Sequence, residues 1–342
     1  MTDLRAALAN LWTGHGRRAR LSRAVLSPIE GAYRAVVKGR GILYDRGLLK
    51  THDVSVPIVS VGNLTVGGTG KTPVAAWLAR QLIERGAHPA IVLRGYGGDE
   101  AIVHQRLNST ISVIECADRV RGMRDAVAEA ADTIVLDDAF QHRRAARDAD
   151  IVLIDADTWS GRRRLLPAGP WREPLSAARR ASLVIVTRKT ADKEAVRAVR
   201  SALALAAPRV PTASLLLAPG ELRSTATGQT MPLQALDGAD VTAIAAIANP
   251  DAFFRQLTQL GAIVRPHSFP DHYGFTQRDA RYLAGSALAS DFAVCTLKDA
   301  VKLEEFWPPE AGSLWYVSQR LKVDDGKHHI DRLLDDLLAL RQ

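Results

Sequence analysis

The sequence predicts an α/β fold in which parallel strands form the centre and helices cover both faces. The first observation is an apolar, β-branched run at 56–61 that feeds a glycine-rich turn and then a helical pattern at 73–79. The second is the alternation of short apolar runs with helical patterns along the rest of the chain, which is typical of βα units. The third is that Gly70-Lys71-Thr72 ends the glycine-rich turn. Together they favour a sheet of the phosphate-loop NTPase type.

The length and composition of the chain fit a globular protein with two domains. The chain has 342 residues, of which 47% are hydrophobic and 24% are charged. Cys116 and Cys295 both lie in apolar surroundings. They exclude a disulfide framework and a CxxC metal pair and favour a reducing compartment. Because the sequence shows no apolar run long enough to span a bilayer and no cleavable signal pattern, we expect a cytoplasmic protein.

Residues 1–50 carry most of the net charge. Ten basic and three acidic side chains give this segment +7 of the chain's formal net charge of +8. Apolar residues at helical spacing begin with Leu4 and Leu8, and Trp12 and Tyr33 stand beside arginines. The pattern predicts a basic amphipathic arm that lies on an anionic membrane surface. Packing of this arm on its own domain is the alternative, and no nucleic acid is expected, since no known binding motif accompanies the charge.

The chain divides into three parts, which are a helical arm at 1–50, a phosphate-loop domain at 51–210 and a smaller α/β domain at 211–342 that closes the active-site cleft. The Ala-Ala-Pro-Arg-Val-Pro run within 200–215 indicates a connection between the two domains. Apolar runs predict strands in the first domain at 90–93, 111–114, 133–136, 151–155 and 183–187, and in the second at 241–248, 262–264, 292–296 and 315–317. Amphipathic spacing and capping residues predict helices at 120–131, at 251–260, from 276 onward and at 330–340.

The glycine-rich turn is the predicted nucleotide site. Its glycines let backbone N–H groups curl around phosphate oxygens, and the helix N-terminus adds a positive dipole. Lys71 reaches the outer phosphates and the Thr72 hydroxyl can hold Mg²⁺. One departure from the usual pattern is Thr65, which stands where a Gly is normal. The predicted phosphate-binding residues are Thr65, Val66, Gly67, Gly68, Thr69, Gly70, Lys71 and Thr72.

Acids follow two of the predicted strands, at the carboxyl ends where ligands gather in an open parallel sheet. Asp99 and Glu100 come soon after the strand at 90–93, and Asp137 and Asp138 come directly after the strand at 133–136. The second pair resembles the acidic nucleotide motif of phosphate-loop enzymes, in which an acid holds Mg²⁺ directly or through water. The sequence therefore predicts that the protein binds a nucleoside triphosphate with Mg²⁺.

The residues alone leave the phosphoryl acceptor open among water, a protein and a hydroxyl of a small molecule or lipid. A phosphate-loop ATPase or GTPase that acts as a switch or chaperone is therefore one hypothesis, although neither 187–190 nor 296–299 has the Asn-Lys-x-Asp pattern of a guanine-specific switch. A kinase needs a group that accepts the hydroxyl proton, and a carboxylate supported by a histidine would serve. Asp99 and His272 are candidates, with a structural role for His272 as the alternative. The proline-rich stretch at 165–174 is either a stiff substrate rim that carries Trp171 and Arg172 or a structural turn.

A family resemblance adds to these inferences. The stretch 62–73, Gly62-Asn63-Leu64-Thr65-Val66-Gly67-Gly68-Thr69-Gly70-Lys71-Thr72-Pro73, closely resembles the phosphate loop of the tetraacyldisaccharide 4′-kinases, the lipid A kinases of Gram-negative envelopes. That family also uses Thr at the position of Thr65. Further matches in chain order are Arg94-Gly95-Tyr96-Gly97, Gly98-Asp99-Glu100, Asp118-Arg119, Asp137-Asp138-Ala139-Phe140-Gln141-His142, Leu166-Pro167-Ala168-Gly169-Pro170 with Arg172-Glu173, Asp271-His272 and Lys298-Asp299-Ala300-Val301-Lys302. The resemblance covers nearly the whole chain.

The resemblance implies transfer of the ATP γ-phosphoryl group to the 4′-hydroxyl of a tetraacylated glucosamine disaccharide 1-phosphate, a late step of lipid A biosynthesis. It implies that Asp99 is the catalytic base, paired with His272, and that Lys71 acts on the phosphates. The residues implied around Mg²⁺ are Thr72, Glu100, Asp137 and Asp138, and those implied near the lipid are Arg119, Gln141, His142, Arg172 and Glu173. It also implies a peripheral protein on the cytoplasmic face of the inner membrane, bound through residues 1–50, with no obligate protein partner.

Two positions depart from the family pattern. Ala139 stands where the family usually has Gly, and an alanine adds strain if that backbone needs a positive φ. The family usually separates the Arg-Gly-Tyr-Gly and Gly-Asp-Glu stretches by a sizeable loop, whereas here they are fused as Arg94–Glu100. One short turn must therefore place Asp99.

Overall fold

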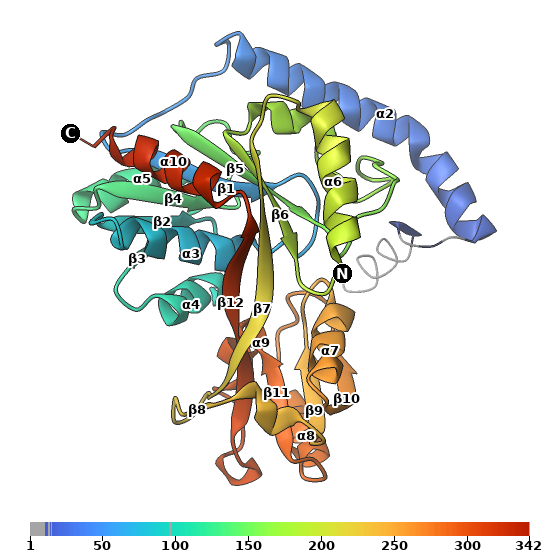
Figure 1. Cartoon of the computed structure of the whole chain (residues 1–342). Helices are drawn as coiled ribbons and strands as arrows, with labels where there is room; N and C mark the ends of the chain where they lie inside the picture. Colours follow the sequence, from blue (N-terminus) through green and yellow to red (C-terminus); the bar gives the residue numbers. More distant parts are fainter. Residues whose placement is uncertain (1–10, 13, 15, 96–97, 342) are drawn as a thin grey trace.

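A single twelve-stranded sheet runs through the molecule (Figure 1). The computed structural model describes residues 11, 12, 14, 16–95 and 98–341. The strand order is β10-β9-β11-β12-β7-β6-β5-β1-β4-β2-β3, with β8 beside β7. Every strand pair that the structure describes is parallel except β7–β12 and β7–β8. The predicted α/β class is confirmed, although one continuous sheet replaces the separate sheets that two domains would have.

The elements alternate along most of the chain. The strands are β1 (Ile58–Asn63), β2 (Pro89–Leu93), β3 (Ser112–Glu115), β4 (Thr133–Asp137), β5 (Ala149–Asp155), β6 (Leu183–Arg188), β7 (Thr212–Ser224), β8 (Thr230–Met231), β9 (Asp240–Ala245), β10 (Ile263–Ser268), β11 (Phe292–Thr296) and β12 (Leu314–Asp325). The helices are α2 (Arg17–Asp45), α3 (Lys71–Ile83), α4 (Asp99–Leu107), α5 (Arg119–Ala128), α6 (Lys193–Ala206), α7 (Pro250–Gln259), α8 (Gln277–Ala287), α9 (Leu297–Leu303) and α10 (Lys327–Leu338).

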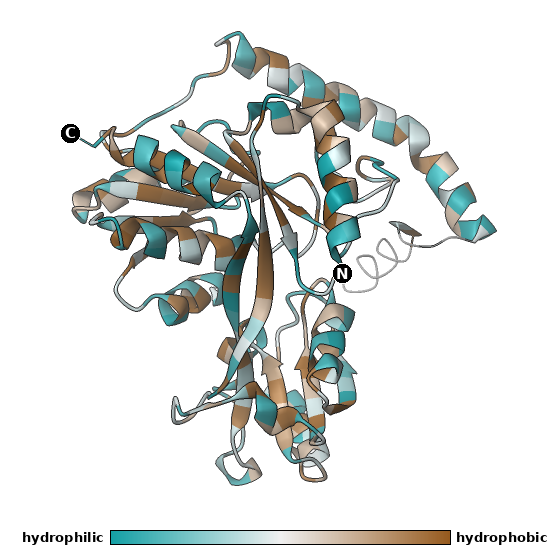
Figure 2. Ribbon diagram, in the orientation of Figure 1, coloured by the Kyte–Doolittle hydropathy of each residue, from teal (hydrophilic) through white to brown (hydrophobic). Residues whose placement is uncertain are grey.

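Alternate residues of the strands build separate cores on the two faces of the phosphate-loop half of the sheet. In β1, Val59 and Val61 pack with α3 and α10, whereas Ile58 packs with α5 on the opposite face. Helix α6 covers the rest of that opposite face. Figure 2 shows these strands in brown and the outer sides of the helices in teal. Because the side-chain period of a strand is two, a strand between two cores is apolar along its whole length.

Two long antiparallel strands, β7 and β12, join the two halves of the sheet (Figure 1). The connection expected within 200–215 lies at its Ala-Ala-Pro-Arg-Val-Pro run but is shorter than predicted, because α6 continues to Ala206 and β7 begins at Thr212. Only a short turn separates them. The partner of β7 lies far away in the sequence, at β12, so no local pattern revealed that this stretch enters the sheet.

The smaller half contains β9, β10 and β11 with α7, α8 and α9. Phe253 of α7 packs on one face of these strands, and Leu283 of α8 packs on the other. Helix α10 returns to the phosphate-loop half, where Ile330 and Leu334 join the core that contains Val59. The sequence grouped 211–342 together, whereas hydrophobic packing places the last helix with the first half, because β12 carries the chain back along β7.

Helix α2 lies across the phosphate-loop half with one side against the body (Figure 1). The Tyr33 hydroxyl donates to the Arg172 carbonyl (3.0 Å), and Trp12 Nε1 donates to the Pro167 carbonyl (2.9 Å). Both aromatic tips therefore face the protein, contrary to the expectation that they lie at a membrane surface. Leu4 and Leu8 lie outside the described residues. Among the helices that the structure describes, none is long and apolar enough to cross a membrane.

Candidate functional site

The candidate site lies at the carboxyl ends of β1, β2 and β4. A pocket there is lined by Lys71, Thr72, Leu93, Arg94, Glu100, Arg119, Asp137 and Asp138. These residues come from the start of α3, the end of β2, the starts of α4 and α5, and the end of β4. The topology therefore brings the phosphate loop and both predicted acid motifs to one edge of the sheet, as a parallel arrangement requires.

The phosphate loop turns sharply between β1 and α3. Gly67 has φ +124° and Gly70 has φ +85°, conformations that strain other residues. Gly62 allows the backbone of the next acid motif to approach, because a Cβ there would lie 2.5 Å from the Cβ of Phe140. Inside the turn, Asn63 Nδ2 donates to Thr69 Oγ1 (3.0 Å). The loop is thus shaped by its own glycines and by a local hydrogen bond.

The segment 164–173 holds the outer edge of the phosphate loop. The backbone N–H of Val66 donates to the Pro170 carbonyl (2.8 Å), and that of Arg172 donates to the Leu64 carbonyl (2.7 Å). Trp171 is buried and contacts Trp159 edge to face. The sequence leaves this stretch as either a substrate rim or a structural turn. Trp171 has a structural role, whereas Arg172 reaches the site.

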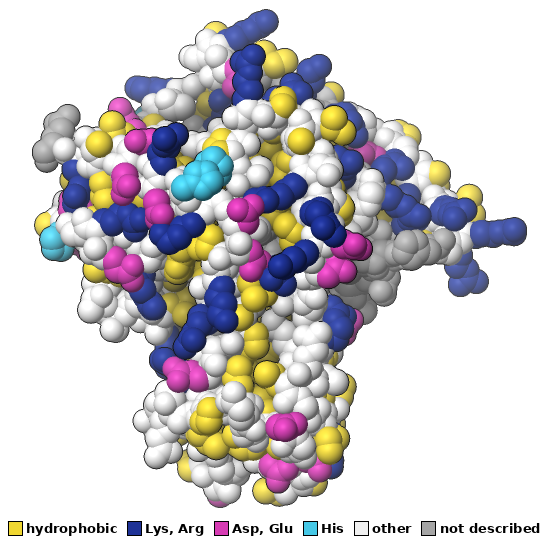
Figure 3. All heavy atoms as spheres, viewed as in Figure 1, with side chains coloured by type: hydrophobic (Ala, Val, Ile, Leu, Met, Phe, Trp, Pro, Cys, Tyr) yellow, Lys and Arg dark blue, Asp and Glu magenta, His cyan; other side chains and the backbone are white. Residues whose placement is uncertain are grey.

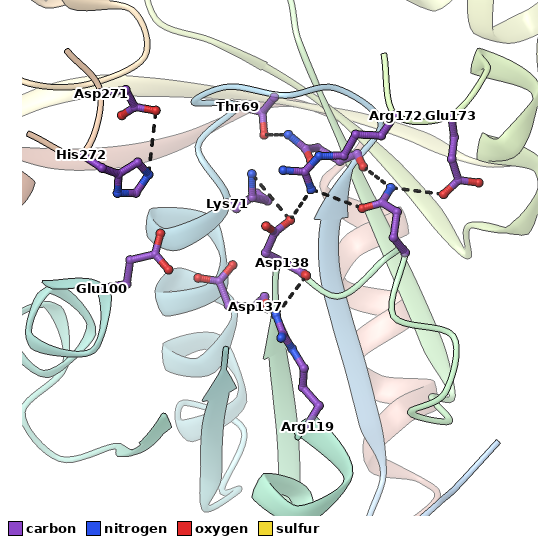
Figure 4. A network of polar contacts seen from close by, with 12 residues as sticks. Thr69, Lys71, Glu100, Arg119, Asp137, Asp138, Arg172, Glu173, Asp271 and His272 are labelled. Atoms are coloured by element: carbon purple, nitrogen blue, oxygen red, sulfur yellow. Dashed lines mark hydrogen bonds and ion pairs between the residues drawn. The ribbon is translucent and has the colours of Figure 1, made fainter. Parts of the chain in front are cut away.

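Two basic side chains, Lys71 and Arg172, meet at Asp138 (Figure 4). Asp138 Oδ1 lies 3.7 Å from Lys71 Nζ and 3.3 Å from Arg172 Nη1. Asp138 itself has φ +50°, which is uncommon for a residue with a side chain. Among the described residues, positive φ outside glycine occurs at Ala130, Asp138 and His272, so the strain expected at Ala139 falls on its neighbour Asp138 instead.

Arg172 connects Asp138 to the other predicted substrate residues. Its Nη1 lies 3.4 Å from Gln141 Oε1, and Gln141 Nε2 donates to Glu173 (3.2 Å). Glu173 also pairs with Arg180 at 2.7 Å. The structure therefore brings Gln141, Arg172 and Glu173 together beside the acid motif (Figure 4).

Arg119 and His142 are placed differently. Arg119 is buried, and its Nη2 donates to the carbonyls of Asp137 and Asp138 at 3.3 Å each, so it supports the acid turn. Burial, together with the charges of Arg119 and neighbouring arginines, lowers the pKa of His142 to about 4. His142 is therefore neutral near pH 7, and it is absent from the described residues that line the pocket.

A histidine that the sequence analysis missed holds Asp137. His104 is fully buried on α4, and its Nε2 lies 2.9 Å from Asp137 Oδ2. Burial raises the pKa of Asp137, but this hydrogen bond and the charges of Lys71 and Lys298 outweigh it and hold the pKa below its usual value. The sequence feature that could have revealed His104 is its spacing of four residues from Glu100, which puts both side chains on one side of α4.

Helix α4 begins at Asp99 and carries both acids in its first turn, where the helix dipole favours negative charge. Gly95 and Gly98 have φ +70° and +80°, which allows the shortened turn after β2. Tyr96 and Gly97 of this turn lie outside the described residues. Asp99 is 7% exposed, and its Oδ1 is buried without a hydrogen-bond partner among the residues that the structure describes.

The loop after β10 brings His272 to Asp99. His272 Nδ1 lies 3.9 Å from Asp99 Oδ2. Its Nε2 lies 3.8 Å from Asp271 Oδ2 (Figure 4). The backbone of His272 has φ +58°. The two predicted catalytic partners therefore meet although they come from opposite halves of the sheet.

Two lysines of α9, to which the sequence analysis assigned no role, face the same acids. Lys298 Nζ lies 3.4 Å from Glu100 Oε1, and Lys302 Nζ lies 3.8 Å from Asp99 Oδ2. Burial lowers the pKa of Lys298, but the surrounding carboxylates, first that of Glu100, outweigh it and raise the pKa. Lys298 is therefore a constant positive charge beside the acids.

The predicted metal residues fit an ion that is held jointly with phosphates. Within the described residues, no group of three His, Cys, Asp or Glu side chains is arranged to hold a metal ion. Mg²⁺ in kinases needs no such cage, since it binds one or two carboxylates together with phosphate oxygens and water. Asp137 Oδ1 is buried without a hydrogen-bond partner among the described residues, and Thr72, Glu100 and Asp138 line the same pocket. This donor set suits Mg²⁺ that arrives with a nucleotide.

Comparisons with known proteins agree with one another. The sequence model of the family described as "Tetraacyldisaccharide-1-P 4'-kinase" matches residues 22–106 and 97–339. A tetraacyldisaccharide 4'-kinase of Anaeromyxobacter sp. (strain Fw109-5) is 37% identical over 365 residues, which cover 98% of this chain and 97% of the relative. One of Anaeromyxobacter dehalogenans (strain 2CP-C) is 40% identical over 319 residues, which cover 85% and 84%.

A solved structure gives the same result. The crystal structure of the "apo" form of LpxK from Aquifex aeolicus in complex with ATP superposes with a TM-score of 0.72 at 27% sequence identity. The match covers 94% of this chain and 99% of that one. The sequence match, the close relatives and the superposition over nearly the full length place this chain in the tetraacyldisaccharide 4'-kinase family.

Proposed function

We propose that this protein transfers the γ-phosphoryl group of ATP to the 4′-hydroxyl of a tetraacylated glucosamine disaccharide 1-phosphate. The observation that carries the proposal is that Asp99 lies directly beside the phosphate-loop pocket, since Glu100, the next residue, lines that pocket together with Lys71 and Thr72. The Oδ1 of Asp99 is buried and has no hydrogen-bond partner among the residues that the structure describes. The loop supplies the donor and Asp99 supplies a base for a hydroxyl acceptor. A hydrolysing switch also needs a group that activates water, so it is membership of the tetraacyldisaccharide 4'-kinase family that favours a hydroxyl acceptor.

In the proposed reaction, Asp99 accepts the proton of the acceptor hydroxyl. The hydroxyl oxygen then forms a bond to the γ-phosphorus, and the bond between that phosphorus and the leaving ADP oxygen breaks. His272, which lies between Asp271 and Asp99, holds the carboxylate of Asp99 in orientation. Lys71 offsets the charge of the transferred group, and Arg172 offsets the charge of Asp138 beside it.

Mg²⁺ would be held by Thr72, Glu100, Asp137 and Asp138, where it supplies charge neutralisation to the phosphate oxygens. Other residues of the chain keep the carboxylates of Asp137 and Asp138 ionised and in place. His104 fixes Asp137 by a hydrogen bond of 2.9 Å, and Arg119 fixes the backbone that carries both acids.

A transfer assay tests the proposal directly. The protein is incubated with γ-labelled ATP, Mg²⁺ and the tetraacyldisaccharide 1-phosphate dispersed in detergent. The label is expected in lipid, in proportion to enzyme, and absent from lipid with the Asp99→Asn variant. Label released as inorganic phosphate at the same rate with and without lipid would instead support the switch or chaperone hypothesis.

The outer side of α2 supports membrane attachment as part of this function. Leu21, Val25, Ile29 and Val36 are 55–75% exposed and fall on one helical stripe. The exposed residues of α2 also include the basic Arg17, Arg18, Arg20, Arg34, Lys38 and Arg40. Figure 3 shows dark-blue side chains along this helix as well as over the rest of the visible face. Apolar side chains flanked by basic ones bind anionic lipid surfaces. We infer that α2 holds the enzyme at the membrane that contains its acylated substrate.

Paired variants separate this stripe from exposed apolar residues elsewhere. Leu21→Ser with Val25→Ser is expected to weaken binding to phosphatidylglycerol vesicles by about tenfold or more. The matched control is Leu205→Ser with Leu288→Ser, since these leucines, on α6 and directly after α8, are 85% and 77% exposed. Equal binding by both double variants in a flotation assay would contradict the attachment through α2.

A further inference from the structure

A buried carboxylate lies on the inner side of α2. Glu30 is 5% exposed on a helix whose other residues are mostly exposed. Its Oε1 accepts the backbone N–H of Leu165 (2.8 Å), and its Oε2 accepts Nε of Arg164 (2.6 Å). Burial raises the pKa of Glu30, but these donors outweigh it and lower the pKa. A buried charge is costly unless it is paired in this way, so the helix is fixed at Glu30 to two successive residues of the segment 164–173.

Three more hydrogen bonds tie α2, and Trp12 shortly before it, to the same segment. The Nη2 of Arg164 donates to Ser27 Oγ on α2 (2.5 Å). Trp12 Nε1 donates to the Pro167 carbonyl and the Tyr33 hydroxyl donates to the Arg172 carbonyl. On its opposite side, this segment binds the phosphate loop through Val66 and Leu64. The segment 164–173 is therefore held between α2 and the phosphate loop, with Arg172 at its end in contact with Asp138.

We propose that Glu30 is a positioning residue that holds the segment 164–173 against the phosphate loop and thereby places Arg172 in the active site. Glu30 contributes the charged contacts, whereas Trp12 and Tyr33 contribute neutral ones. Helix α2 then serves catalysis even where no membrane is present. The kinetic part of this proposal rests on the function proposed above for Arg172.

The test compares two variants of the same helix in detergent, where attachment to a bilayer is not limiting. Glu30→Gln keeps the size and removes the charge, and kcat/KM for the lipid acceptor is expected to fall about tenfold. Asp45→Asn is the matched control, because Asp45 also pairs with an arginine of the body, Arg143 (2.8 Å), but makes no contact with 164–173 that the structure describes. It is expected to keep kcat/KM within about twofold.

A double-variant cycle shows whether Glu30 acts through Arg172. Arg172→Ala is expected to lower activity, and Glu30→Gln is expected to lower it by less than about twofold more in that background. An equal loss from Glu30→Gln in both backgrounds would overturn the proposal, since it would mean that Glu30 supports only the general stability of the fold.

Limited proteolysis tests the clamp independently of the reaction. Trypsin is expected to cleave after Arg164 faster in Glu30→Gln than in wild type or Asp45→Asn, as followed by mass spectrometry. Unchanged cleavage would overturn the proposed clamp. If cleavage rises while Arg172→Ala is fully active, the clamp stands and it is the function proposed for Arg172 that fails.

Discussion

The nucleotide side and the acceptor side of the site are built in different ways. The nucleotide side is one continuous stretch between β1 and α3, and the hydrogen bond from Asn63 to Thr69 fixes its turn locally. The acceptor side collects Asp99 from α4, His272 from the loop after β10 and Lys302 from α9. There, His272 and Lys302 lie 3.9 and 3.8 Å from Asp99. The proposed nucleotide site therefore depends on local structure, whereas the surroundings of the proposed base depend on how the two halves of the sheet meet.

The largest effects are expected from one residue on each side. Asp99→Ala should lower kcat by about 10³-fold and leave the KM for ATP nearly unchanged, because Asp99 acts on the acceptor hydroxyl. Lys71→Ala should lower kcat and also raise the KM for ATP, because Lys71 acts on the donor phosphates. Steady-state kinetics with detergent-dispersed lipid separates the two patterns.

A matched control is Asp125→Ala on the outer side of α5, where Asp125 is half exposed. It should behave as wild type. An Asp99→Ala enzyme with near-normal kcat would show that Asp99 is not the base. The proposed division into a nucleotide side and an acceptor side would then be wrong.

His272→Ala should have an intermediate effect, with kcat reduced about tenfold and the KM for ATP unchanged. His272 contacts Asp99 at 3.9 Å and belongs to the acceptor side alone. Single-turnover measurements at saturating ATP provide the test. A change confined to the KM for ATP would instead place His272 on the nucleotide side.

Lys302 should show a smaller effect, since its proposed role is to hold Asp99 in place. Its side chain is 16% exposed, and it lies 3.8 Å from Asp99. Lys302→Gln should lower kcat about fivefold, or about 1 kcal/mol, and Lys302→Arg should restore most of it. Lys327→Gln, which removes an exposed ion pair with Asp331 on α10, is the control. Failure of arginine to rescue activity would argue against a role for the charge.

The smallest effect on activity is expected at Asp155, at the end of β5, the strand beside β1. Burial raises the pKa of Asp155 from 3.8 to about 6. The folded protein therefore binds this proton more tightly than the unfolded chain, and it loses stability as the pH rises from about 4 to about 6, a loss that persists above that range. The side chain in Asp155→Asn does not titrate, so this variant does not lose stability at that position as the pH rises.

Thermal unfolding measures this difference. At about pH 7.5 the Asp155→Asn protein should be more stable than wild type by up to about 3 kcal/mol, and at about pH 4 the two should be nearly equal. The kcat should not change. A difference between the two proteins that does not vary with pH would mean that Asp155 is not protonated on folding.

Much of the site was predictable because its signals are local. The phosphate loop, the acids at the ends of two strands and the helix that follows Asp118 can each be predicted from a few adjacent residues, and the structure has them at one pocket. His104 was missed because a lone histidine in an amphipathic helix carries no signal until β4 is packed beside it. Lys298 and Lys302 were noticed as a motif, but their role depends on α4, which they reach only in the folded chain.

The sequence by itself determined the α/β class, the phosphate loop and the family resemblance, because glycine conformations, strand periodicity and adjacent functional residues are properties of short stretches. Only the tertiary structure decided that β7 pairs with β12, that α10 packs on the phosphate-loop half, and that Trp12 and Tyr33 face the body. These contacts join residues far apart in the chain. Which segments pair depends on the total apolar surface that both partners bury together. The sequence pattern of either partner alone does not show which partner that is.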